Sequence, residues 1–164
     1  MLIIVRGNSG SGKSTVARAL RERLGPNTML VAQDVIRREI LKVKDKPNNP
    51  AIDLLFQICS YGQTIGYNVI LESILSTGTY AAMLHKLLEA YPSHLVYYFD
   101  VSFEETLARH QTKPNAHEFG ESEMREWWHE KDFLHIPDER AIPQSLSLEE
   151  TVDRIIQDYK NQKR

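Results

Sequence analysis

One segment near the start of the chain restricts the possible fold more than any other. Residues 7–14 have the sequence GNSGSGKS and match the pattern G-x-x-x-x-G-K-[ST] at every fixed position. The apolar run Leu2–Val5 precedes this segment, and the helix-compatible stretch Lys13–Leu24 follows it. A strand, a glycine-rich turn and a helix in this order direct successive backbone N–H groups at a phosphate. The sequence therefore predicts a phosphate-binding loop at a strand-to-helix junction.

This loop also predicts the ligands. We expect it to bind ATP, with Lys13 bridging the β- and γ-phosphates and Ser14 giving its hydroxyl to Mg²⁺. A turn that binds nothing is the alternative, but such a turn needs only one or two glycines and no Lys-Ser pair at this spacing. The predicted nucleotide-binding residues of the loop are Gly7, Asn8, Ser9, Gly10, Ser11, Gly12, Lys13, Ser14 and Thr15.

Apolar runs and helix-period segments alternate along most of the chain. Further strands are expected at Met29–Ala32, Asn68–Leu71, His94–Phe99 and near Arg140–Ile142, and further helices at Val35–Leu41, Ile52–Ile65, Tyr80–Glu89, Phe103–His110 and Leu148–Tyr159. The strands do not alternate between apolar and polar residues, which indicates that both faces of the sheet are buried. The predicted fold class is α/β, with a parallel sheet and helices on both faces.

Length and composition fit one domain. The chain has 164 residues, and we expect residues 1–164 to form a single unit in which a polar, aromatic-bearing segment at about 111–137 is a helical lid insertion. The net charge of -2 argues against binding to long nucleic acid. The first apolar run is too short to cross a membrane. Cys59, the single cysteine, is expected to be a half-buried free thiol in a protein of the reducing cytoplasm.

The acceptor side of the site is predicted from Asp34, Arg37 and Arg38. Asp34 follows the second strand, and the carboxyl ends of parallel strands lie at the edge where such folds bind ligands. A carboxylate there can accept the proton of an attacking hydroxyl, and Arg37, one helical turn on, can hold an anionic group of the substrate. The alternative role for Asp34 is to cap the following helix.

Glu72 ends the apolar run of the third strand. An acid at this position is typical of a residue that faces Mg²⁺ directly or through water, and Glu72 can instead bind hydroxyl groups of the substrate. Both roles are open.

Arg109 and Lys113 are four residues apart and share one face if the helix continues that far. Both can reach the transferring phosphates, since arginine grips phosphate oxygens through a planar fork. The alternative is a solvated basic face. Aromatic residues of the 111–137 segment, Trp127 among them, either pack or close over the ligand.

Several of these motifs together resemble a known family. The sequence GNSGSGKST, the pair Asp34-x-x-Arg37, Glu72 and Arg109-His110, followed by Lys113-Pro114 and by Trp127, is similar to the P-loop kinases of the nucleotide-kinase-like group. This group includes small bacterial kinases related to polynucleotide kinase, gluconate kinase and zeta-toxin-like kinases. The resemblance implies a three-layer P-loop NTPase fold with strand order 2-3-1-4-5. It also implies that Asp34 activates the acceptor hydroxyl and that Arg109 stabilises the transferred phosphate.

The resulting functional hypothesis is an ATP-dependent kinase that phosphorylates a hydroxyl of a small molecule such as a nucleoside, sugar or antibiotic-like metabolite. One alternative is a polynucleotide 5′-hydroxyl kinase, because the Asp34-x-x-Arg37 pair resembles the base-plus-arginine element of that class. Another is an ATPase or regulatory switch that transfers no phosphate to an acceptor. Asp34 close to the phosphate loop favours a hydroxyl acceptor over water.

Overall fold

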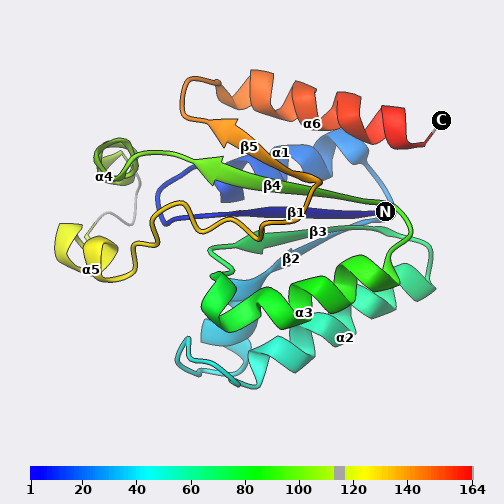
Figure 1. Cartoon of the computed structure of the whole chain (residues 1–164), viewed down its shortest axis with the longest axis horizontal. Coiled ribbons are helices and arrows are strands. Elements are labelled where there is room, and N and C mark those ends of the chain that lie inside the picture. The colour runs from blue at the N-terminus through cyan, green and yellow to red at the C-terminus, as the bar shows by residue number, and fades with distance from the viewer. Residues whose placement is uncertain (113–116, 164) are drawn as a thin grey trace.

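A five-stranded parallel sheet forms the centre of the computed structural model, which describes residues 1–112 and 117–163 (Figure 1). The strand order is β2-β3-β1-β4-β5, as the family resemblance implied. The strands are β1 (Leu2–Gly7), β2 (Thr28–Ala32), β3 (Asn68–Ser73), β4 (His94–Asp100) and β5 (Glu139–Pro143). The predicted α/β class is confirmed.

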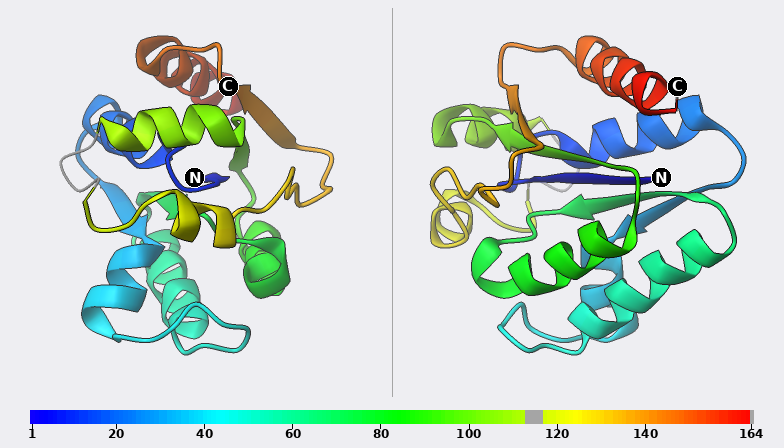
Figure 2. Two further views of the ribbon diagram at one scale, coloured as in Figure 1. Left: turned by 90° about the vertical axis from the view of Figure 1, so that its left-hand side faces the viewer. Right: turned by 45° about the vertical axis from the view of Figure 1, so that its right-hand side comes forward.

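Helices cover both faces of this sheet. The described part of the chain forms the helices α1 (Lys13–Leu24), the π-helix η1 (Val35–Ile40), α2 (Ala51–Thr64), α3 (Thr77–Ala90), α4 (Phe103–Gln111), α5 (Glu121–Glu126) and α6 (Leu148–Gln162). Helices α1 and α6 lie on one face, and α2 and α3 lie on the other (Figures 1 and 2). No helix in the described part of the chain is long and apolar enough to span a membrane.

The central strand β1 shows why its sequence is apolar throughout. Leu2 and Ile4 belong to the core on the α2–α3 side, while Ile3 and Val5 belong to the core on the α1–α6 side. All four side chains are fully buried, and each contributes about 1.5–3 kcal/mol relative to an exposed position. A strand that packs on both faces therefore needs a continuous apolar run.

Cys59 is more deeply buried than we expected. The prediction of a half-buried thiol is wrong, because the side chain is fully enclosed in the core between the sheet and α3. Burial raises the pKa of the Cys59 thiol to about 12, so the group stays protonated and behaves as a small apolar side chain.

The carboxyl ends of β1, β2 and β3 meet at one edge of the sheet. Glu72 of β3 is in register with Val5 of β1 on one side and with Ala32 of β2 on the other. The residues that follow these strands, 8–12 after β1 and 33–34 after β2, therefore emerge beside Glu72. The fold gathers most of the predicted site residues at this edge.

The 111–137 segment, which we expected to be a helical lid insertion, contains the short helix α5, whose bounds the sequence did not indicate. Helix α5 begins after Gly120, whose backbone N–H donates to Glu123 Oε2 at 3.0 Å, and only Met124 of this helix is buried. A short helix with one buried side chain has no apolar period that a sequence pattern could reveal. Lys113 of the same segment lies outside the described residues.

Candidate active site

The loop between β1 and α1 has a backbone that only glycine permits at two positions. Gly10 has φ +80°, and a Cβ there would lie 2.5 Å from the Thr106 carbonyl oxygen. Gly12 has φ +96° and directly precedes α1, whose N-terminus has no side-chain cap. The buried hydroxyl of Ser11 has no hydrogen-bond partner in the described structure. The uncapped helix end and this hydroxyl provide donors that fit a phosphate group.

Lys13, Ser14 and Glu72 lie together beside the loop. Lys13 Nζ donates to the Asn8 carbonyl at 2.8 Å, and Ser14 Oγ donates to Glu72 Oε2 at 3.0 Å. Burial raises the pKa of Glu72, although the charge of Lys13 and the bond from Ser14 oppose this shift. A hydroxyl and a carboxylate in contact supply the hard oxygen ligands that Mg²⁺ prefers. The pair therefore fits a Mg²⁺ ion that also binds phosphate oxygens.

Asp34 lies at the start of η1 and forms ion pairs with two arginines. The η1 segment is π-helical, since the Leu41 N–H donates to the Ile36 carbonyl five residues earlier. Asp34 Oδ1 is 3.0 Å from Arg37 Nη2 and 3.4 Å from Arg38 Nε. The Asp34 side chain does not cap the helix and is 56% exposed. Its carboxylate therefore faces solvent and charged groups, not the backbone of η1.

These three residues line a cavity of about 460 Å³ at the carboxyl edge of the sheet. We call it the acceptor cavity, and its lining includes Asp34, Arg37, Arg38, Lys44, Ser73 and Trp127. Ser73, the residue after Glu72, lines this cavity, so the cavity borders the strand end that carries Glu72 and its bond to Ser14. The volume is in the range of small-molecule sites.

Arg109 lies beside a different cavity, of about 350 Å³, which we call the outer cavity. Its guanidinium donates to Glu105 Oε1 at 2.7 Å, to the Ser11 carbonyl at 3.0 Å and to the Gln144 carbonyl at 3.0 Å. Arg109 thus connects the phosphate loop to the segment between β5 and α6. Gly12 and Thr15 also line the outer cavity, whereas Asp34 does not.

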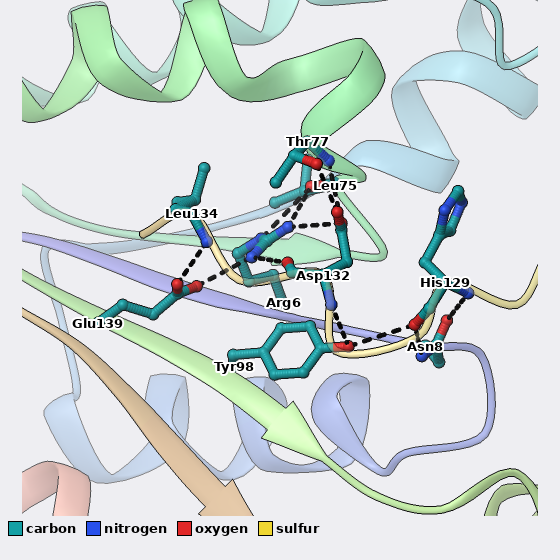
Figure 3. A network of polar contacts seen from close by, with 9 residues as sticks. All are labelled: Arg6, Asn8, Leu75, Thr77, Tyr98, His129, Asp132, Leu134 and Glu139. Carbon is teal, nitrogen blue, oxygen red and sulfur yellow. Dashed lines mark hydrogen bonds and ion pairs between the residues drawn. The ribbon is translucent and has the colours of Figure 1, made fainter. Parts of the chain in front are cut away.

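Arg6, which sequence reasoning missed, is the centre of a buried polar network (Figure 3). Its guanidinium donates to the Leu75 carbonyl at 3.0 Å, to Asp132 Oδ2 at 2.9 Å and to Glu139 Oε1 at 2.9 Å, and it lies 5.3 Å from the Tyr98 ring. The Arg6 side chain is fully buried. An arginine inside an otherwise apolar strand was the signal, because a buried cation requires partners.

The same network connects the phosphate loop to the segment after α5. Asn8 Nδ2 donates to the His129 carbonyl at 2.7 Å, and the His129 N–H donates to Asn8 Oδ1 at 2.9 Å. A side-chain amide has one donor group and one acceptor, so it pairs with a peptide group as a neighbouring strand would. The side chain of Asn8, which we predicted as nucleotide-binding, therefore holds residue 129 next to the loop (Figure 3).

Comparisons with known proteins show the family and the fold of this chain. A family described as an AAA domain matches residues 2–131. No curated protein sequence matches the chain significantly. Similar solved structures include the APS kinase of Mycobacterium tuberculosis in complex with AMPPNP and APS, with a TM-score of 0.72, 18% identity and coverage of 97% of this chain and 96% of that one.

Two further solved structures have the same architecture. A gluconokinase from Sinorhizobium meliloti 1021 has a TM-score of 0.63 at 19% identity, and the match covers 99% of this chain and 97% of the gluconokinase chain. Shikimate kinase from Aquifex aeolicus vf5 has a TM-score of 0.55 at 20% identity, with coverage of 98% and 97%. At these identities the likeness establishes the fold, which is the three-layer P-loop NTPase fold.

Proposed function

Since the chain belongs to the AAA domain family, and the matched region contains the phosphate loop, we propose that it is an ATP-dependent phosphotransferase acting on a hydroxyl of a small molecule. The observation that carries this proposal is the position of Asp34. Its carboxylate lines the acceptor cavity together with Ser73, the residue after Glu72, while Glu72 bonds to Ser14 of the loop. The neighbouring ends of β2 and β3 thus bring a candidate base to the same edge as the candidate metal ligands.

On the nucleotide side, residues 7–15 hold the phosphates of ATP and the outer cavity takes the base. Arg109 lines that cavity with all three guanidinium nitrogens already engaged, so we assign it to nucleotide binding in this conformation. Its role in stabilising the transferred phosphate, and the phosphate contact expected from Lys113, stay predictions. Mg²⁺, held by Ser14 with Glu72, would neutralise charge on the β- and γ-phosphates when bound.

On the acceptor side, the hydroxyl oxygen attacks the γ-phosphorus and the bond from that phosphorus to the β–γ bridging oxygen breaks, so that ADP leaves. Asp34 accepts the hydroxyl proton, and Lys13 stabilises charge on the phosphate oxygens. Arg37 and Arg38 exchange their ion pairs with Asp34 for contacts with the substrate or with the developing charge. The named activities of the solved structures, on gluconate, APS and shikimate, support a small acceptor.

Two other functions stay as alternatives. A 5′-hydroxyl oligonucleotide end fits the Asp34–Arg37 ion pair, and an ATPase or switch would use the phosphate loop without an acceptor. We expect the protein to work in the cytoplasm, where its buried free thiol stays reduced.

A transfer screen tests the proposal. The protein is given γ-labelled ATP and Mg²⁺ with nucleosides, sugars, sugar acids, aminoglycoside-like alcohols and 5′-hydroxyl oligonucleotides. Label should appear on one acceptor class, Lys13→Ala should lose productive ATP binding, and Asp34→Asn should keep ATP affinity but lose transfer by roughly 10²-fold or more. The exposed Asp53→Asn change is the matched control. Label found only as free phosphate would favour the ATPase or switch.

A further inference from the structure

The acceptor cavity has an excess of positive charge. Arg37, Arg38, Lys44 and Lys46 line it, against the three carboxylates of Asp34, Asp45 and Glu126. Asp34 is shared between the two arginines, while the side chains of Lys44 and Lys46 make no hydrogen bond or ion pair with any part of the chain that the structure describes. Two cations at the rim of this cavity therefore lack a protein partner.

The segment that carries these lysines, residues 42–50, is anchored by hydrogen bonds. Tyr80 is fully buried, and its hydroxyl donates to Asp45 Oδ1 at 2.6 Å while Gln33 donates to the same hydroxyl. Asn49 Nδ2 donates to the Lys46 carbonyl at 2.8 Å. The Asp45 carboxylate accepts this bond from Tyr80, and no ion pair joins it to either lysine in the described structure. The segment is thus anchored at Asp45 and Asn49, while the two lysine side chains stay exposed and unpaired.

Arg37 adds an unsatisfied donor to the same cavity. Its side chain is only 11% exposed, and its buried Nε has no hydrogen-bond partner in the described structure, with Asp45 Oδ2 3.9 Å away. A buried guanidinium donor left without an acceptor costs free energy. A ligand oxygen in the cavity would remove that cost.

From these contacts we infer that the acceptor is a hydroxyl compound that carries an oxyanion, bound by Lys44, Lys46 and Arg37. The oxyanion takes over the role of Asp34 as counter-ion of the arginine, which frees Asp34 for the hydroxyl proton. Trp127 supplies an apolar wall for the carbon skeleton between these two groups. The transfer step rests on the proposed function, whereas oxyanion binding does not require it.

A binding titration tests the inference directly. Trp127 lines the cavity, so its emission reports binding in a Trp128→Phe background, with Mg²⁺ and AMPPNP present to fill the phosphate loop. The probes are inorganic phosphate and two matched pairs, ribose with ribose 5-phosphate and glucitol with gluconate, which separate phosphate from carboxylate. We expect at least one anionic member to bind about tenfold or more tightly than its neutral partner.

Two variants locate the charge effect. Lys44→Met combined with Lys46→Met should raise the dissociation constant of the anionic probe by about tenfold, since two exposed loop lysines can be replaced without disturbing the core. Lys42→Met is the control, because Lys42 belongs to the same segment but does not line the cavity. The inference is overturned if no saturable response depends on the charge of the probe, or if the double variant binds the probe unchanged.

The label-transfer screen separates this inference from the proposed function. Charge-dependent binding without transfer to any acceptor would leave the oxyanion site standing and remove the phosphotransferase proposal. Transfer to neutral acceptors, with no preference for their anionic partners, would support the phosphotransferase proposal and remove the oxyanion site.

Discussion

Arg6 is a fully buried cation whose two carboxylate partners lie far away in the sequence, at Asp132 and Glu139. In Arg6→Met, both carboxylates lose their cation and stay largely buried. We expect the free energy of unfolding to fall by about 3–5 kcal/mol, because an uncompensated buried charge is strongly unfavourable. Urea unfolding measures this change.

Arg23→Met is the matched control for that experiment. Arg23 pairs with Asp153 at 2.5 Å, but both side chains are about half exposed, so the pair is screened by water. Its loss should cost no more than about 1 kcal/mol. Equal destabilisation by the two changes would show that burial of the Arg6 network does not determine its contribution.

Arg109 permits a test between two roles through steady-state kinetics. If it shapes the cavity for the base, Arg109→Lys should raise the KM for ATP by about tenfold with little change in kcat, since lysine cannot maintain three separate hydrogen bonds. A fall in kcat with unchanged KM would instead support the role in stabilising the transferred phosphate.

Arg125→Lys provides the comparison for Arg109→Lys. Arg125 forms the same type of ion pair, with Glu121 four residues earlier on a helix, but it does not line the outer cavity. Its replacement should leave the KM for ATP unchanged.

At the level of single residues, the sequence predicted best where the chain order fixes the position. Ser14, Asp34 and Glu72 each follow or end a parallel strand, so the rule that strand ends share one edge was enough to bring them together. Arg6 was missed because its partners Asp132 and Glu139 belong to distant segments. No local pattern indicates which remote carboxylate meets a buried cation.

Among the elements, strands were predicted well because burial on both faces leaves a continuous apolar run. The helix at 35–41 was predicted in place, but its π-helical hydrogen bonding was not, because apolar spacing over so few residues does not distinguish helix types. Helix α5 lies within the segment that we expected to be helical, but its bounds were not predicted since it buries only Met124. Elements held by tertiary contacts, and not by their own apolar period, are the ones that sequence patterns do not reveal.

The hydrogen bonds between Asn8 and His129 predict that the phosphate loop limits local opening of the segment after α5. In Asn8→Ala the segment after α5 loses its paired hydrogen bonds to the phosphate loop. Hydrogen–deuterium exchange at the His129 amide should become about tenfold faster, while the stability of the sheet changes little. Asn161→Ala, at an exposed position on α6, is the control. Unchanged exchange at residue 129 would contradict this coupling.

Considered as a whole, the molecule places its phosphate loop where several parts of the chain meet. Three segments bond to this region: Glu72 of β3 to Ser14, Arg109 of α4 to the Ser11 carbonyl, and the His129 backbone after α5 to Asn8. The loop region is therefore bordered by groups from segments on both sides of β1. Binding of Mg²⁺ with AMPPNP should stabilise the entire fold, by about 2.7 kcal/mol at a ligand concentration one hundred times the dissociation constant.

Glu72 should make the free energy of unfolding of the ligand-free protein depend on pH. Burial raises the pKa of its carboxyl above the usual value of 4.5, so without a ligand the folded state holds the Glu72 proton more tightly than the unfolded state. Stability from this group is therefore complete below about pH 4.5 and is lost as the pH rises through the folded-state pKa. Glu72→Gln has no such proton and should not show this loss.

Urea unfolding of the wild type and of Glu72→Gln, measured from pH 4.5 to pH 8, tests this reasoning. Without ligand, the wild type should lose stability relative to the variant as the pH rises. With Mg²⁺ and AMPPNP present, the order should reverse at neutral pH, because a cation beside Ser14 favours the ionised carboxylate that glutamine cannot supply. Parallel pH curves for the two proteins would mean that Glu72 is as well solvated in the folded chain as in the unfolded one. A reversal without Mg²⁺ would mean that the nucleotide alone, and not the metal, is linked to this carboxylate.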